Sequence, residues 1–291
     1  MGRSGFKKRF FFPTGVDRLK WLRLILLGLV VLLLLAGLLF WFLPAQLALP
    51  LLQKRLGEVQ LRGVHGLLWD GSADQVVGSH GQNLGRLQWQ LSRRVILGQT
   101  QLGVQFQGPQ LSFDAKVAKS GDADTVLDDA HAHIDLALQP AAPGARLGTP
   151  RGMLDLQIPH ALLQGPWPQQ LEAQAQWHAA RMQVVAGQDQ LGEVAANDVA
   201  LGELRLELHG QQGVIDGNLR DDGKSPLQVD AQLQASPLGW RFNAVLTLRS
   251  SDPALHRWLQ QFGTPDAAGA WHVERSGGLA AKSVNKEKHH R

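Results

Sequence analysis

The chain has 291 residues, 44% of them hydrophobic, and it contains neither cysteine nor tyrosine. Without cysteine there is no disulfide, thiolate metal site or cysteine nucleophile, so a packed core must supply the stability. The formal net charge is +4, but the first 23 residues hold seven basic side chains and one acid, Asp17, which leaves a net charge of −2 for the remainder. This balance argues against nucleic acid as a partner.

An uncharged apolar run extends from Leu24 to Leu43. Twenty helical residues span about 30 Å, the thickness of a bilayer core. Trp21 and Trp41 lie near its two ends, where indole rings favour the headgroup region. The run is longer than the apolar region of a secretory signal and ends in aromatic residues instead of a small-residue cleavage site. We expect a retained transmembrane helix at residues 21–43, with a cleaved signal peptide as the alternative.

The basic residues before this run predict its orientation. Positive charge beside a first transmembrane segment stays on the cytoplasmic side. We therefore expect a cytoplasmic tail at residues 1–20, an exported domain at residues 44–275, and a disordered basic tail at residues 276–291, which is polar and contains glycine.

Apolar and polar residues alternate through most of the exported part, which is typical of half-buried β-strands. Leu87, Trp89 and Leu91, for example, alternate with Gln88 and Gln90. The predicted strands lie at about residues 87–91, 102–106, 111–117, 130–138, 154–158, 171–177, 201–208, 214–219, 227–233 and 240–248. Glycine and proline fall between them at short intervals, as in an antiparallel meander. The fold class is mainly β, with a single curved layer and a sandwich both open.

One exported segment has a helical pattern. Asp252 is suited to the N-cap, Pro253 to the first helical position, and Gly263 to the stop. A weaker helical pattern runs over residues 45–56, where Pro50 would kink the helix.

The search for catalytic or metal-binding residues finds little. His131 and His133 would share a strand face with Asp135, but no further His or Cys pair stands at a supporting spacing, so the polar face of a strand is the simpler interpretation. The segment from Gly78 to Gly81 lacks the glycine-flanked serine of a hydrolase elbow. No nucleophile, base and orienting group can be assigned, and we expect no enzyme activity, cofactor or metal.

Several motifs occur in an order that resembles the N protein family of the bacterial type II (general) secretion pathway. After the apolar run comes the segment VHGLLWDGSA from Val64 to Ala73, then Leu87-x-Trp89-x-Leu91 and a glycine turn at Gly98. The late segment LQQFGTP, which contains Gly263 and Pro265, is similar to the closing motif of the family.

The resemblance implies a single-pass inner-membrane protein of a Gram-negative bacterium. Its periplasmic domain would dock other secretion components for the export of folded proteins across the outer membrane. The matched residues would be structural: Leu68, Trp69, Gly71, Trp89, Gly98, Gly263 and Pro265. Among them Trp69 and Trp89 would fill the core, and Gly71 and Gly98 would take positive φ angles.

A second hypothesis is a lipid-handling module similar to AsmA-like and bridge-like envelope proteins. Antiparallel strands behind one anchor can curl into a trough with an apolar inner face. In a sandwich, Leu102, Val104, Phe106, Leu111 and Phe113 would be covered by a second layer, whereas in a trough they would line an open groove.

Overall fold

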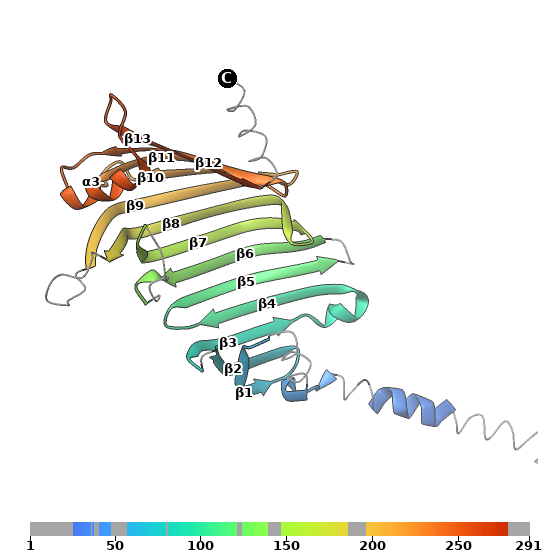
Figure 1. Ribbon diagram of the computed structural model, residues 1–291. Coiled ribbons are helices and arrows are strands. Elements are labelled where there is room, and N and C mark those ends of the chain that lie inside the picture. The colour runs from blue at the N-terminus through green and yellow to red at the C-terminus, as the bar shows by residue number, and fades with distance from the viewer. Residues whose placement is uncertain are drawn as a thin grey trace, which may run out of the picture.

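The computed structural model describes residues 26–35, 37, 41–47, 57–79, 81–120, 124–138, 147–185 and 196–278. Residues 26–35 are helical, and Figure 1 shows this helix apart from the sheet. Among the described residues, no helix combines the length and hydropathy needed to cross a bilayer. Leu24 and Trp21 lie outside the described residues, as do the basic segment before them and residues 48–56 of the weaker predicted helix.

Thirteen strands form one open antiparallel sheet in which each strand pairs with the next along the chain (Figure 1). The strands are β1 (Gln60–Gly66), β2 (Asp70–Val77), β3 (Asn83–Leu91), β4 (Gln99–Gln107), β5 (Leu111–Ser120), β6 (Asp124–Asp135), β7 (Thr149–Gln164), β8 (Trp167–Val185), β9 (Ala196–Gln211), β10 (Val214–Asp221), β11 (Leu227–Ser236), β12 (Gly239–Leu248) and β13 (Ala270–Gly278). The predicted antiparallel meander is therefore confirmed, and of the two arrangements left open the described strands adopt the single layer.

Some strand boundaries differ from the predictions. β1, β2 and β13 were not predicted as strands, because their apolar positions are interrupted by glycine and charged residues. β6 ends at Asp135, where the chain turns into the 3-10 helix η2 (Leu136–Leu138). β13 continues to Gly278, so the first residues of the predicted basic tail belong to the sheet. The rest of that tail lies outside the described residues.

The predicted short helix is confirmed as α3 (Pro253–Leu259), followed by the 3-10 helix η3 (Gln260–Phe262). The Asp252 carboxylate accepts a hydrogen bond from the Ala254 N–H at 2.8 Å, as an N-cap does. α3 lies against the C-terminal strands (Figure 1) and buries Leu255, Trp258 and Leu259.

The described core is concentrated at the two ends of the sheet. The larger cluster joins α3 to the C-terminal strands and contains Ala180, Val199, Leu201, Leu204, Leu227, Val229, Ala231, Ala244, Leu246, Leu255, Trp258, Leu259, Trp271 and Val273. A small cluster at the other end contains Ala45, Val64 and Ala73. Between them Leu102, Val104, Leu111 and Phe113 are only half-buried, although Phe106 is 8% exposed. The middle strands therefore carry an apolar face without a second layer of described residues.

Candidate functional site

The register of the strands sorts side chains into one polar and one apolar face. Residues opposite each other in neighbouring strands share a face, so a row can be followed from β1 to β13. One such row has a polar residue in every strand: His65, Ser72, Gln88, Gln105, Asp114, His131, Gln157, Gln174, Glu207, Asn218, Gln232, Asn243 and Glu274. The row contains no Lys or Arg. The polar face is thus a continuous, amide-rich surface.

The adjacent row on the other face is apolar in every strand. It consists of Val64, Ala73, Leu87, Phe106, Phe113, Ala132, Leu156, Ala175, Leu206, Leu219, Ala231, Ala244 and Val273. Phe106 and Phe113 stack in it with ring centroids 5.5 Å apart. Since the alternation is kept across all thirteen strands, the two faces have opposite chemical character along the whole sheet.

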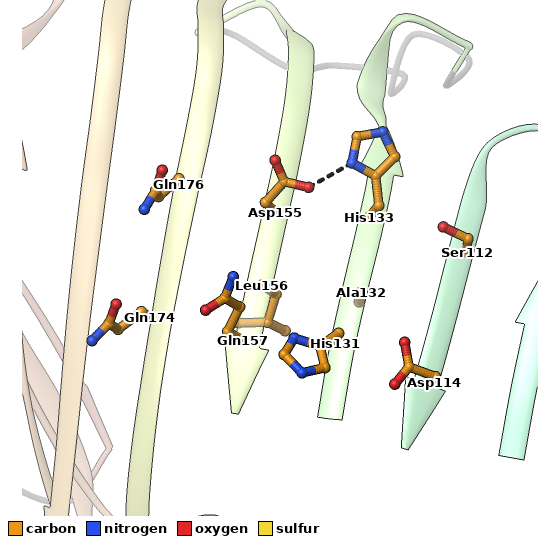
Figure 2. Close-up of a pocket in the computed structure, with 10 residues that line it drawn as sticks. All are labelled: Ser112, Asp114, His131, Ala132, His133, Asp155, Leu156, Gln157, Gln174 and Gln176. Atoms are coloured by element: carbon orange, nitrogen blue, oxygen red, sulfur yellow. Dashed lines mark hydrogen bonds and ion pairs between the residues drawn. The ribbon is translucent and has the colours of Figure 1, made fainter. Parts of the chain in front are cut away.

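The centre of the polar face is hollowed over β5 to β8. The hollow has a volume of about 220 Å³ and is lined by Ser112, Asp114, His131, Ala132, His133, Asp155, Leu156, Gln157, Gln174 and Gln176. Figure 2 shows His133 and Asp155 joined by a hydrogen bond, and His131 beside Gln157 and Asp114. A larger hollow of about 1080 Å³ lies over β1 to β7. Its lining combines polar residues such as Gln88, Gln105 and Lys116 with apolar ones such as Trp89, Leu102 and Val104. Both hollows are open, and the smaller one is lined mainly by hydrogen-bonding groups.

Histidines and carboxylates form a chain of contacts across four strands of this face. His133 Nδ1 lies 2.5 Å from Asp155 Oδ1, and the other oxygen of Asp155 lies 3.2 Å from His178 Nε2. His178 Nδ1 lies 2.7 Å from Glu203 Oε2. An imidazole donates from both nitrogens only when it is protonated, so a positive charge on His178 would satisfy both carboxylates. The Glu203 carboxylate also accepts the Ala179 N–H at 2.8 Å.

Charged pairs occur elsewhere on the same face. Lys116 Nζ lies 2.9 Å from Asp129 Oδ2, and this contact raises the pKa of Lys116 and lowers the pKa of Asp129. Both side chains are exposed, so solvent screens the pair. Among the described residues, no group of three His, Asp or Glu side chains is arranged to hold a metal ion. His133 contacts Asp155 instead of Asp135, whose carboxylate accepts the Ala137 N–H.

The N-terminal motif residues lie where the chain enters the sheet. Trp69 is 5% exposed, and the Nε1 of Trp89 donates to the Leu68 carbonyl at 3.1 Å. The positive φ expected at Gly71 is wrong, because Gly71 is not among the described glycines that have one. Glycine is needed at this position for a steric reason, because a Cβ at Gly71 would lie 2.4 Å from the Trp89 ring.

The remaining motif residues end short helical segments or lie after them. Gly98 has a φ of +79° and ends the 3-10 helix η1 (Arg93–Leu97). Gly263 has a φ of +121°, and its N–H donates to the Gln260 carbonyl at the end of η3. Pro265 is exposed in the loop before β13. These residues shape turns and do not line the hollows of the polar face.

Sequence reasoning missed the chain of histidines and carboxylates. Its members come from four strands and are far apart in sequence, so only the register of β6 to β9 brings them together. The available signal was weak: His131, His133 and Asp155 each stand at a polar position of an alternating segment.

Comparisons with known proteins agree on one family. The family model described as "Type II secretion system (T2SS), protein N" matches residues 57–274. The chain is 30% identical over 245 residues to the type II secretion system protein N of Vibrio cholerae serotype O1 (strain ATCC 39315 / El Tor Inaba N16961), a match that covers 81% of this chain and 91% of that protein. No solved structure matches. The chain therefore belongs to the type II secretion system protein N family.

Proposed function

We propose that this component of type II secretion is a single-pass inner-membrane protein. Its N-terminus lies in the cytoplasm, residues 21–43 cross the membrane, and the β domain lies in the periplasm, where it docks other secretion components without catalysing a reaction. Membership of the family links the chain to type II secretion.

The exposed helix at residues 26–35 supports the membrane anchor. Its large side chains are between 47% and 68% exposed: Leu26, Leu27, Leu29, Val30, Val31, Leu32, Leu33, Leu34 and Leu35. A helix that is apolar all round needs an apolar environment, and the described residues of the sheet do not cover this helix. The chain reaches the sheet through residues 41–47, where the Trp41 ring packs under the Arg93 guanidinium at 4.1 Å.

The continuous polar face is the observation that carries the docking role. It extends over thirteen strands, with amides, carboxylates and imidazoles directed outward and two open hollows. Such a surface offers many hydrogen-bonding groups to another protein. Its histidines and carboxylates contact each other. The Ser225 hydroxyl donates to the Asp222 carboxylate at 2.6 Å, but Ser225 is buried in the turn before β11 and lines neither hollow.

Fusions at the C-terminus test the topology. Alkaline phosphatase is active only after export, whereas green fluorescent protein fluoresces well only in the cytoplasm. We expect an active phosphatase fusion and a dark fluorescent fusion, with the full-length chain in the membrane fraction. A fluorescent fusion, or mature protein that lacks its first 40 or so residues, would overturn the proposed topology.

Deletion and cross-linking test the docking role. We expect deletion to reduce the export of folded proteins, and cross-linking in intact membranes to join the β domain to another secretion component. Normal export after deletion together with no cross-link to any secretion component would exclude this role.

A second candidate function is the handling of lipid, which the uncovered apolar face of β4 to β8 favours. Benzoylphenylalanine at Val104 or Leu156 would probe this face, and the same label at Gln105 or Gln157 is the matched control on the polar face. A lipid-handling module predicts phospholipid adducts at the apolar positions alone, detected by mass spectrometry. Equal adduct yields on the two faces would exclude it.

A further inference from the structure

The two edges of the sheet differ in how their backbone groups are occupied. At β1 the preceding segment covers the edge: Pro44 forms a bridge with Leu67, and the Leu68 N–H donates to the Leu43 carbonyl at 2.9 Å. The Gln46 side chain donates to the Val64 carbonyl at 3.2 Å, and Ala45 is 2% exposed. The chain's own residues therefore occupy this edge from Val64 to Leu68.

At β13 the edge is regular. All nine of its residues pair with β12 without a register shift, and no strand of the described residues follows it in the sheet. Its first residue is occupied on the outer side, because the Ala270 N–H donates to Asp266 Oδ1 and the Ala270 carbonyl accepts the Asp266 N–H, both at 2.9 Å. Backbone groups of successive residues point to alternate sides of an antiparallel strand. The N–H and C=O groups of His272, Glu274 and Ser276 therefore point outward as well.

These outward groups are nearly free among the residues that the structure describes. None of them takes part in a backbone hydrogen bond outside the ladder, and a side chain covers just one, since Arg275 Nη1 donates to the Glu274 carbonyl at 3.0 Å. Edge strands are usually protected by proline, a bulge, charged side chains or a covering segment. β13 contains no proline and no bulge. Its two charged residues, Glu274 and Arg275, are both exposed, and Arg275 can rotate away.

We propose that the β13 edge receives an extended segment of another secretion component, which adds to the sheet as a fourteenth strand. This inference rests on the proposed docking role and names its site. The backbone groups of His272, Glu274 and Ser276 bond the incoming strand once Arg275 releases the Glu274 carbonyl. Main-chain pairing of this kind supplies affinity, and the alternating side chains supply specificity.

The side chains of β13 define the chemistry of the partner segment. Trp271 and Val273 lie on the apolar face and are already covered by the domain, at 3% and 7% exposed. A partner side chain on that face would lie beside this core, which favours apolar residues there. Arg275 follows them on the same face and favours an aromatic or acidic neighbour. Glu274 on the polar face favours a basic residue opposite it. The partner is thus an extended segment that alternates apolar and polar residues and is basic on its polar side.

A second copy of this chain fits the edge less well. Pairing two β13 strands would put the two β1 edges at opposite ends of a double sheet, about 25 strand spacings or roughly 120 Å apart. Each β1 edge is joined to its own apolar helix, and the proposed topology requires both helices to lie in one membrane. A partner that approaches from beyond β13 meets no such constraint.

Because the chain lacks cysteine, an introduced cysteine can carry a single photoreactive label. The full-length chain in membranes of a secreting strain is labelled with benzophenone maleimide at Ser276→Cys, with Gln232→Cys as the exposed control on the same face and Arg62→Cys as the control at the β1 edge. Adducts are identified by mass spectrometry. We expect the Ser276→Cys label to join one secretion component at ten or more times the yield of either control.

Proline at Glu274 separates strand pairing from general proximity. Glu274→Pro removes an outward N–H that does not bond β12, so the domain should fold while the adduct falls at least tenfold. Glu274→Ala should retain the adduct, and Arg275→Ala should increase it by freeing the Glu274 carbonyl. Gln228→Pro in the central strand β11 removes a hydrogen bond of the ladder and provides the comparison for misfolding. If Glu274→Pro also fails to fold, the increase expected for Arg275→Ala becomes the decisive measurement.

The outcomes separate this inference from the proposed function. An adduct that survives Glu274→Pro in a folded domain, an Arg275→Ala variant without any increase, or an adduct with residues 279–291 or a second copy would overturn strand addition at β13. If a secretion component reacts with the Gln232→Cys label but not with the Ser276→Cys label, docking stands and the β13 site is wrong. If no position reacts and deletion leaves export intact, the proposed function itself fails.

Discussion

The C-terminal strands β9 to β13 and the middle strands β4 to β8 share one alternation of residues but are stabilised differently. At the C-terminal end, α3 covers the apolar face and leaves Leu255 and Leu259 fully buried. In the middle, Leu102, Val104 and Phe113 remain half-buried, and no described helix lies over them. Alternation thus decides which face a side chain joins, whereas the presence of a second layer decides how much that side chain stabilises the fold.

This difference also separates stability from the surfaces available for binding. The covered end has the core of an ordinary two-layer domain. The middle strands depend on ladder hydrogen bonds and on neighbouring side chains within one layer. Substitutions that remove apolar atoms should therefore cost more at the covered end, and the following predictions test that comparison.

The largest effect is expected at Leu259, which is 0% exposed between α3 and the sheet. Leu259→Ala should reduce the free energy of unfolding by about 3 kcal/mol, because the cavity lies in a closed core. Leu156→Ala in β7 is the matched change on the uncovered face and should cost about 1 kcal/mol, since solvent already reaches this side chain. Urea unfolding of the full chain in detergent, followed by tryptophan fluorescence, measures both. Equal losses would mean that the middle strands are also covered.

The middle strands have one position where a larger effect is expected. Phe106 is 8% exposed and stacks on Phe113. Phe106→Ala should cost about 2 kcal/mol, less than a phenylalanine in a closed core, because only strand neighbours surround the ring. Phe106→Leu should recover about half of that loss by keeping most of the apolar contact. If Phe106→Ala costs as much as Leu259→Ala in the same urea titration, the contrast between the two regions is wrong.

A carboxylate near the covered end gives this region a specific pH dependence. Asp221 is 5% exposed at its side chain and accepts hydrogen bonds from Arg249, from the Val229 N–H at 2.9 Å and from the Gly223 N–H at 2.7 Å. Burial raises the pKa of Asp221, but these hydrogen bonds outweigh it and leave the pKa below its usual value.

The sign of the effect follows from the lowered pKa. The stabilisation by Asp221 is fully present above the pKa of the unfolded chain, about 3.9, and is lost as the pH falls through the lower folded value. Asp221→Asn should cost about 1 kcal/mol at pH 7, and the difference from the wild type should shrink as the pH falls below the unfolded value of about 3.9. Unfolding titrations at pH 7, 5, 4 and 3 test this, with Asp216→Asn on an exposed part of β10 as the control. A difference that is constant with pH would contradict the assigned hydrogen bonds.

The sequence predicted the faces of the sheet well, because strict alternation is local. Leu87, Trp89 and Leu91 fall on the apolar face, as the period of two indicated. The cap of α3 was equally local, since Asp252 and Pro253 are adjacent. Pairing between strands of seven to nineteen residues was not local, and strand ends were therefore less certain than strand faces.

Two features could not be predicted from the sequence: contacts that depend on the strand register, and non-glycine residues with a positive φ. The chain of contacts from His133 to Glu203 needs four strands in a fixed register. Bulges in β6 and β8 contain Asp129 and Ala179 with a φ of +48°, although neither is a glycine. In a sequence, a glycine is the usual sign of a left-handed backbone conformation, so nothing marked these two positions.

The smallest effect is expected at the bulge in β8, and its sign is opposite to the others. Ala179 is exposed, and its N–H donates to Glu203 Oε1, a hydrogen bond that Ala179→Gly retains. Glycine removes the cost of a left-handed Cβ but adds chain entropy to the unfolded state, which leaves a net gain of about 0.5 kcal/mol. Ala175→Gly, in the regular part of the same strand, should lose stability instead. Equal destabilisation of both glycine variants in urea would show that the sheet does not hold Ala179 in the left-handed conformation. The bulge would then not set the strand register on which the polar row depends.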